Sequence, residues 1–98
     1  MPDAIATEFA DDNRTRVTRW SFAAAGDSTG HHVHEFDYIV VPVTGGALTV
    51  VAPDGREAPM QQVAAAPYRG VAGTSHTVVS ADASPVVFVE IELKSPEG

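Results

Sequence analysis

Cysteine is absent from the 98-residue sequence. This absence excludes disulfides, thiolate nucleophiles, iron–sulfur clusters and thiolate zinc sites. Basic residues are scarce as well, because six lysines and arginines stand against thirteen acidic residues and leave a net charge of -7. A chain this acidic repels phosphate backbones, so nucleic acid is not an expected partner.

Long apolar runs are also missing. The longest span only a few residues, such as 86–89, whereas a membrane-spanning helix needs about 20. Residues 1–13 carry four acidic side chains and no basic cluster, unlike a secretory or transit peptide. We therefore expect no membrane partner and a cytoplasmic location.

A helical pattern is the third feature that the sequence lacks. The alanine clusters at 23–25 and 64–66 are each followed at once by glycine or proline. Turn-rich clusters instead separate short runs of valine, isoleucine, threonine and aromatic residues. We predict strands at residues 14–22, 32–43, 47–52, 58–63, 66–69, 76–80 and 86–93, with a further short strand at 7–9. Hairpin-like turns are predicted at 44–46 and 53–55.

These elements predict an all-β protein, either a small barrel or a two-sheet jelly roll. Trp20 and Phe22 share one face of their strand, which predicts a place in the core or in a dimer interface. Glu90 and Glu92 alternate with apolar residues in the last strand. We interpret this alternation as a half-exposed strand whose glutamates face the solvent.

Four histidines are the most informative residues of the sequence. His31, His32 and His34 begin one predicted strand, and His76 begins another. Alternate side chains of a strand share a face, so His32 and His34 project together, as does Tyr38. Two such imidazoles can hold one metal ion if His76 supplies a third ligand from a facing strand. Surface histidines without any metal are the alternative interpretation.

The spacing around these histidines resembles the first motif of the cupin family, G-x5-H-x-H-x3-4-E-x6-G. Gly26, His32, His34 and Gly45 occupy the glycine and histidine positions, and Tyr38 stands in place of the glutamate. The second cupin motif, G-x5-P-x-G-x2-H-x3-N, matches less well. Its second glycine and its histidine are present, but its other three positions differ; the five residues are Ala65, Val71, Gly73, His76 and Ser80.

The resemblance covers residues 14–94 and implies one small cupin domain over 1–98, a jelly-roll barrel with a short N-terminal arm at 1–13. A narrower resemblance comes from residues 29–38, which fit the pattern T-G-x-H-x-H-x-x-D-Y of short bacterial single-domain cupins. The segments V-V-P at 40–42 and V-F-V-E-I-E-L-K at 87–94 accompany it. Some members of that group are named for β-alanine degradation, a name that identifies no reaction.

The cupin resemblance implies one divalent transition metal per chain, held by His32, His34 and His76. Three imidazoles suit iron, zinc or nickel, and the loss of the carboxylate disfavours harder ions such as manganese. The family contains enzymes and non-catalytic modules. We therefore expect metal-dependent conversion of a small polar metabolite, by a three-histidine Fe(II)-type oxygenase, isomerase or lyase. The alternative is a small-molecule or metal-binding module. Short cupins usually pair, so a homodimer is expected.

Tyr38 is the candidate catalytic residue and has three interpretations: a phenolate ligand, a hydrogen-bonding or acid–base group beside the metal, or an aromatic filling the barrel. Asp37 would reach the metal only if a bulge shifted the parity of its strand. His31 has the wrong parity and is expected to be a rim or surface residue rather than a fourth ligand. Tyr68 and Arg69 precede the His76 turn, so either is a candidate for the wall of the pocket. Arg69 is either a carboxylate-binding residue or part of a surface ion pair.

Overall fold

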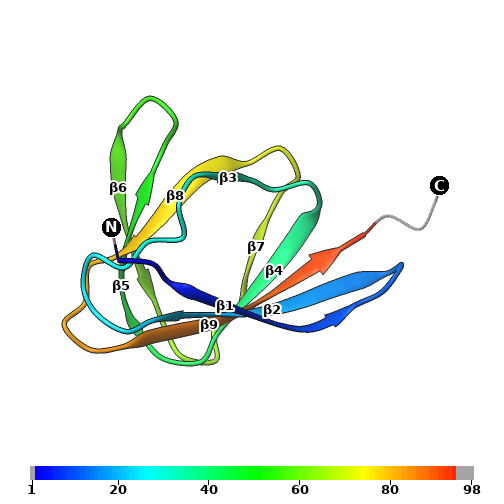
Figure 1. The fold of residues 1–98 in the computed structure, drawn as a ribbon, viewed down its shortest axis with the longest axis horizontal. Coiled ribbons are helices and arrows are strands. Elements are labelled where there is room, and N and C mark those ends of the chain that lie inside the picture. Colours follow the sequence, from blue (N-terminus) through cyan, green and yellow to red (C-terminus); the bar gives the residue numbers. More distant parts are fainter. Residues whose placement is uncertain (1, 95–98) are drawn as a thin grey trace.

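The computed structural model describes residues 2–94 and contains nine β-strands over that range (Figure 1). They are β1 (Ile5–Asp11), β2 (Thr15–Phe22), β3 (His32–Val33), β4 (Asp37–Pro42), β5 (Gly46–Val51), β6 (Glu57–Gln62), β7 (Tyr68–Gly70), β8 (Ser75–Ser80) and β9 (Val86–Leu93). Residues 1 and 95–98 of the predicted 1–98 domain lie outside the described residues. Over the described range, no helix has the length and apolar character needed to cross a membrane.

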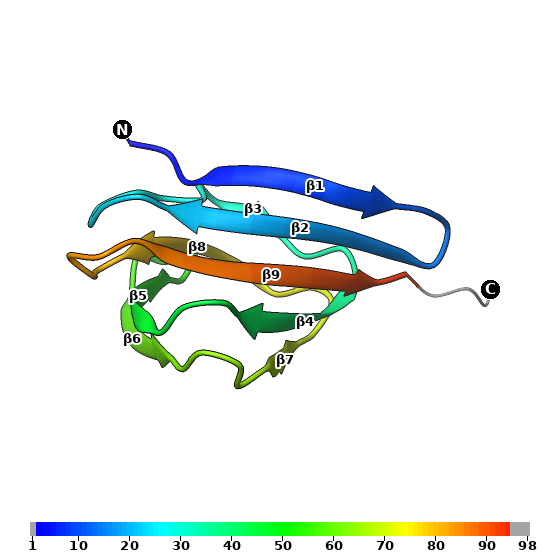
Figure 2. The same ribbon diagram turned by 90° about the horizontal axis from the view of Figure 1, so that it is seen from below.

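The strands form two antiparallel sheets. One has the order β1-β2-β9-β4-β7 and the other β3-β8-β5-β6, so chain segments far apart in sequence pair with each other. Figure 2 shows β1, β2, β9 and β4 side by side in the first sheet. This arrangement confirms the predicted all-β jelly roll, although the two sheets do not close into a hydrogen-bonded barrel.

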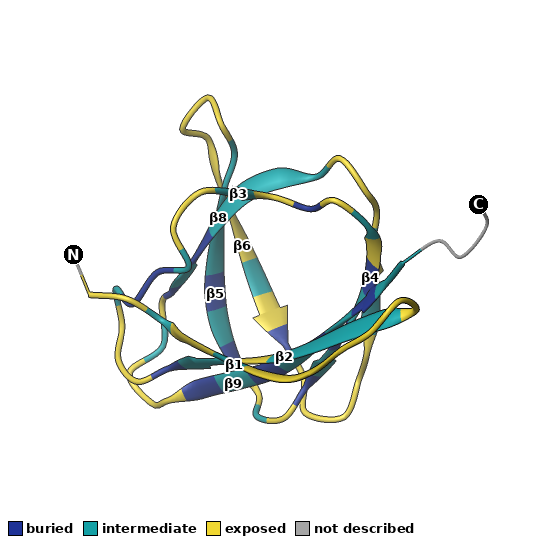
Figure 3. Cartoon of the chain, turned by 45° about the vertical axis from the view of Figure 1, so that its right-hand side comes forward, coloured by how far each residue is buried: buried dark blue, intermediate teal, exposed yellow. Residues whose placement is uncertain are grey.

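The core lies between the sheets and draws side chains from both. The buried hydrophobic residues are Phe22, Tyr38, Val40, Leu48, Val78, Val86 and Phe88, and Trp20 packs against them. Figure 3 shows buried segments on strands of both sheets, including β4, β5 and β9. Burial of these apolar groups is the main favourable contribution to folding. The predicted core position of Phe22 is confirmed, since its side chain is fully buried.

The predicted strand at 32–43 is in fact two strands in different sheets. β3 pairs with β8, whereas β4 pairs with β7 and β9, so residues 34–36 carry the chain from one sheet to the other. The predicted hairpin at 44–46 is also wrong, because β4 and β5 belong to different sheets. The turn at 53–55 does join a true hairpin of β5 and β6, and Gly55 adopts the left-handed φ of 90° that the turn needs.

The N-terminal segment is more regular than the short arm expected from the sequence. Ile5–Asp11 forms β1, the edge strand of the five-stranded sheet, and pairs along most of its length with β2. The register shifts between Glu8 and Ala10, which marks a β-bulge. This irregularity and the mixed polar and apolar side chains explain why the alternation pattern predicted only residues 7–9.

The orientation of β9 is opposite to the prediction. Glu90 and Glu92 are only 9% and 6% exposed, so the interpretation that they face the solvent was wrong. Both share the inward parity of Phe88. Glu92 is held there by Arg16, whose Nε and a terminal guanidinium nitrogen donate to its two carboxylate oxygens, each at 2.6 Å. Such a two-point ion pair offsets part of the free-energy cost of burying a carboxylate.

Candidate metal centre

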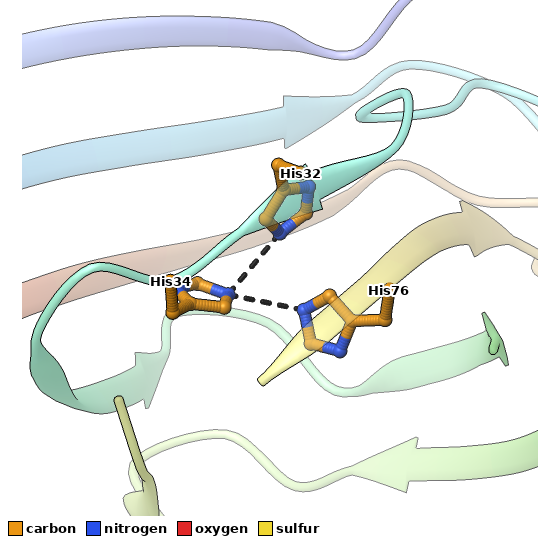
Figure 4. Close-up of side chains that lie close together, drawn as sticks. All are labelled: His32, His34 and His76. Atoms are coloured by element: carbon orange, nitrogen blue, oxygen red, sulfur yellow. Dashed lines mark hydrogen bonds between the residues drawn. The ribbon is translucent and has the colours of Figure 1, made fainter. Parts of the chain in front are cut away.

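Three histidines from two neighbouring segments meet at one point (Figure 4). His32 on β3 and His76 on β8 are direct cross-strand partners, and His34 follows β3 where the chain leaves the four-stranded sheet. The Nε2 atom of His34 lies 3.1 Å from that of His32 and 3.0 Å from that of His76. The structure therefore brings the three predicted ligands together.

The spacing of these nitrogens fits a single metal ion. Metal–nitrogen bonds of about 2.0–2.1 Å with bond angles of roughly 90–110° place neighbouring ligand nitrogens about 2.9–3.4 Å apart. The two measured separations, 3.1 and 3.0 Å, fall in this range, and the potential ligand atoms all lie within 4.8 Å of one another. The cluster could hold one ion with little movement.

The protonation of the histidines also suits a metal. Burial, with a smaller contribution from the neighbouring imidazoles, lowers the pKa of His34 and of His76 to about 4. Both rings are then neutral at neutral pH, which is the form that binds metals. His32 places Nδ1 3.0 Å from the carbonyl oxygen of Gly30. A carbonyl only accepts hydrogen bonds, so Nδ1 carries the proton and Nε2 keeps its lone pair toward the cluster.

The loop before β8 fixes the position of His34. The backbone N–H of His34 donates to the carbonyl of Thr74, and the N–H of Gly73 donates to the carbonyl of His34, both at 2.8 Å. Gly73 has a φ of 91°, which favours glycine. The glycine and histidine of the second motif thus act together, because the turn that leads to His76 also holds His34.

Tyr38 packs against the histidine cluster and is not a member of it. Its ring stacks on that of His34, with centroids 3.8 Å apart, and its other surroundings include the backbone of Gly70, where an added Cβ would overlap the tyrosine ring. Burial, followed by the charge of Glu90, raises the pKa of the Tyr38 phenol. A neutral phenol favours the hydrogen-bonding and packing interpretations over the phenolate ligand.

The remaining candidates lie around the cluster rather than in it. Asp37 is exposed, and its Oδ1 accepts a hydrogen bond from the N–H of Ala72 at 2.8 Å. His31 is also exposed and places Nε2 2.8 Å from the Ser75 hydroxyl. Arg69 is an exposed residue that contributes to the lining of the adjoining cavity. Asp37 and His31 thus have structural or surface contacts and are not members of the histidine cluster.

Glu90 is the site residue that the sequence interpretation missed. Its Oε2 lies 3.9 Å from Nδ1 of His34, on the side of that ring opposite the nitrogen that faces the cluster. Burial, and then the neighbouring Glu92, raises the pKa of Glu90 to about 7. Parity places Glu90 on the face of Val86 and Phe88, but only the structure shows that this face is the inner one.

A cavity of about 410 Å³ adjoins the histidines, between the two sheets. The three histidines, Tyr38, Tyr68 and Glu90 contribute to its polar wall, and burial raises the pKa of Tyr68 to about 12. The rest of the wall is largely apolar and includes Trp20, Val40, Val50, Met60, Val78 and Phe88. A metal bound to the histidines would therefore face a space large enough for a small molecule.

Comparison with known proteins finds similar sequences and structures over nearly the whole chain. No family model matches the sequence. The chain is 46% identical to the β-alanine degradation protein BauB of Pseudomonas aeruginosa over 94 residues, which cover 95% of this chain and 96% of that protein. It is 39% identical to the crystal structure of a cupin domain from Bordetella pertussis, with a TM-score of 0.90 and 96% of each chain covered.

More distant structures share the fold alone. A protein with a double-stranded β-helix domain from Klebsiella pneumoniae has a TM-score of 0.74 at 18% identity, covering 98% of this chain and 81% of that chain. The fold, the histidine cluster and the two closer similarities lead to one conclusion: the chain belongs to the cupin family.

The two lowered pKa values predict a pH dependence for the metal-free protein. His34 and His76 have a pKa of 6.5 in the unfolded chain and of about 4 in the folded protein. Between these two pH values the unfolded chain therefore binds more protons than the folded protein. The stability that His34 and His76 contribute is complete above pH 6.5 and is lost as the pH falls toward 4. Urea unfolding between pH 4 and 7 should show a flatter profile for the His34→Gln, His76→Gln double variant.

Glu90 acts with the opposite sign, since its raised pKa contributes stability that is lost as the pH rises from about 4.5 through 7. It is present in both proteins, so the comparison isolates the histidines. His31→Gln is the control and should retain the profile of the unaltered protein. Equal slopes in the double variant and the unaltered protein would contradict the prediction.

Proposed function

We propose that His32, His34 and His76 hold one divalent transition metal per chain, and that the protein acts on a small metabolite in the adjoining cavity. The observation that carries this proposal is the convergence of three Nε2 atoms, 3.0–3.1 Å apart along the cluster, at the wall of that cavity. An all-nitrogen donor set favours iron, zinc or nickel over harder ions. A metal of this kind would polarise a substrate oxygen or bind O2.

The chain itself would position the metabolite and move a proton. Tyr38 lines the cavity, stacks on His34 and keeps its phenol proton at neutral pH. We propose that its Oη donates a proton to, or accepts one from, the bound metabolite. Oxygenation, isomerisation and lyase chemistry can each use such a group, and the expected three-histidine oxygenase is one of these proposals. The name of the BauB relative supports a small metabolite of amino-acid or carboxylate catabolism as the substrate.

The alternative is a binding module of the same fold that performs no reaction. Oxygen consumption by the Fe(II)-loaded protein, and product analysis with zinc or nickel, across a panel of small acids and diketones separate the two. Turnover supports the enzyme, and full metal occupancy without turnover supports the module. The cytoplasmic location stays a prediction of the sequence.

The metal site can be tested by elemental analysis of protein purified without an affinity tag and reconstituted with Fe(II), Zn(II) or Ni(II). We expect one ion per chain, and His76→Ala should bind it roughly a hundredfold more weakly or worse, because one of three ligands is lost. His31→Ala is the matched control and should bind as tightly as the unaltered protein, since His31 contacts Ser75 instead. Equal metal content in the two variants would contradict the three-histidine site.

Tyr38→Phe separates the roles of the tyrosine. The substitution removes only the hydroxyl and keeps the ring that stacks on His34. We expect metal content to stay at one ion per chain and turnover to fall by about 10²–10⁴-fold, the usual range for removing an acid–base group. Loss of the metal would identify Tyr38 as a ligand, and unchanged metal and turnover would identify a packing role.

We also propose that the protein is a homodimer, paired through the outer face of the five-stranded sheet. The outward side chains of β9 are Val87, Val89, Ile91 and Leu93, and all are half-buried rather than buried. Their cross-strand neighbours continue the apolar surface, since Ile91 lies between Val17 on β2 and Ile39 on β4. A sheet face open to water is usually polar, so an apolar outer face supports a partner of the same kind.

Substituting the centre of this face tests the dimer. Ile91→Arg should shift the mass measured by sedimentation from twice the 10.3 kDa of one chain to that of a single chain, because an unpaired cation would be buried in the interface. Val63→Arg is the control, since Val63 is 61% exposed and lies outside the sheet. A monomeric unaltered protein, or a dimeric Ile91→Arg variant, would overturn this proposal.

A further inference from the structure

The cavity beside the histidines has walls of two kinds. Its polar groups include the three histidines, Tyr38, Tyr68 and Glu90, whereas the remainder is mainly aliphatic and aromatic, as in Met60 and Phe88. We propose that the natural ligand binds the metal through a single anionic oxygen group and places an apolar hydrocarbon part in the rest of the cavity. This inference rests on the proposed metal site. The chemical class of the ligand is a monocarboxylate with an aliphatic or phenyl substituent.

Among the described residues, the cations near the cavity offer no partner for a second anionic group of the ligand. The guanidinium of Arg16 is occupied by both carboxylate oxygens of Glu92 at 2.6 Å and does not line the cavity. Arg69 contributes to the lining, but it is exposed and pairs in register with Ile39, on the outer face of its sheet. Within the described part of the chain no other lysine or arginine lines the cavity. A second carboxylate or a phosphate would lose its hydration there without gaining a cationic partner.

The apolar wall also disfavours an ammonium group. Val40, Val78 and Phe88 are between 3% and 6% exposed, and none offers a hydrogen-bond acceptor from its side chain. Glu90 is the acidic residue of the lining, and it lies beside His34 and opposite Val40 in the sheet. An ammonium group that does not reach Glu90 would be desolvated among hydrocarbon groups.

The volume leads to the same ligand class. At about 30 Å³ for each water-sized group, 410 Å³ has room for about thirteen such groups. β-Alanine has only about half that number of non-hydrogen atoms, and it carries the ammonium group that the wall disfavours. A hexanoate or phenylacetate skeleton fills the cavity better and buries its carbon atoms against Met60, Val50 and Trp20.

Zinc-loaded protein, with its zinc content measured first, allows binding to be tested without turnover. Isothermal titration with acetate, butyrate, pentanoate and hexanoate should show affinity rising roughly threefold to fourfold for each added methylene, about a hundredfold from acetate to hexanoate. Two matched pairs test the charges. Butyrate should bind at least tenfold tighter than β-alanine, which has an ammonium in place of its methyl group, and pentanoate at least tenfold tighter than glutarate.

Met60→Gln places an amide on the apolar wall with little change in size. We expect it to reduce the gain from acetate to hexanoate by at least tenfold while acetate binding and zinc content stay unchanged. Val63→Gln is the matched control and should behave as the unaltered protein, because Val63 is exposed and does not line the cavity.

The outcomes distinguish this inference from the metal proposal. Protein that binds no zinc overturns the metal site itself. Zinc-loaded protein that binds none of the carboxylates, that binds them without dependence on length, or that prefers β-alanine or glutarate to its partner overturns the ligand class and leaves the metal site standing. A length dependence that persists in Met60→Gln assigns the apolar contact to another surface and also overturns the inference.

Discussion

The pairing of β3 with β8 is the contact on which the candidate site depends. β3 contains only two residues, yet it sets His32 directly opposite His76. A strand this short contributes little stability by itself. Two backbone hydrogen bonds between His34 and the turn at residues 73–74 also hold the register. A slip of one residue would turn the histidine side chains to opposite faces and separate the three nitrogens.

The second constraint is the burial of charged groups between the sheets. Glu92 is paired with Arg16, whereas Glu90 lies near His34 at a longer distance and with a raised pKa. These carboxylates occupy inward positions of β9 that an ordinary jelly roll would fill with apolar side chains. Their presence leaves the apolar residues of the same strand facing outward, so the chemistry of the site and the apolar outer surface follow from one alternation pattern.

Much of the fold could be predicted from short patterns. Turn residues separated strands correctly in most of the chain. His32, His34 and Tyr38 all line the cavity as expected, although the chain changes sheets between His34 and Tyr38. Glu90 was assigned to the wrong face because alternation states that two faces differ without stating which one is inside. The hairpin at 44–46 failed for a related reason, since a tight turn can join paired strands or carry the chain between sheets.

The sequence by itself identified the three candidate ligands, because residue type and motif spacing indicate which side chains can offer a neutral nitrogen to one ion. It also determined the family, because the other positions of the first motif match although Tyr38 stands in place of the glutamate. Only the tertiary structure decided which face of β9 is buried, how Glu90 lies relative to His34, and that the cavity beside the histidines is largely apolar. These features depend on packing between strands far apart in the chain, and local periodicity carries no information about that packing.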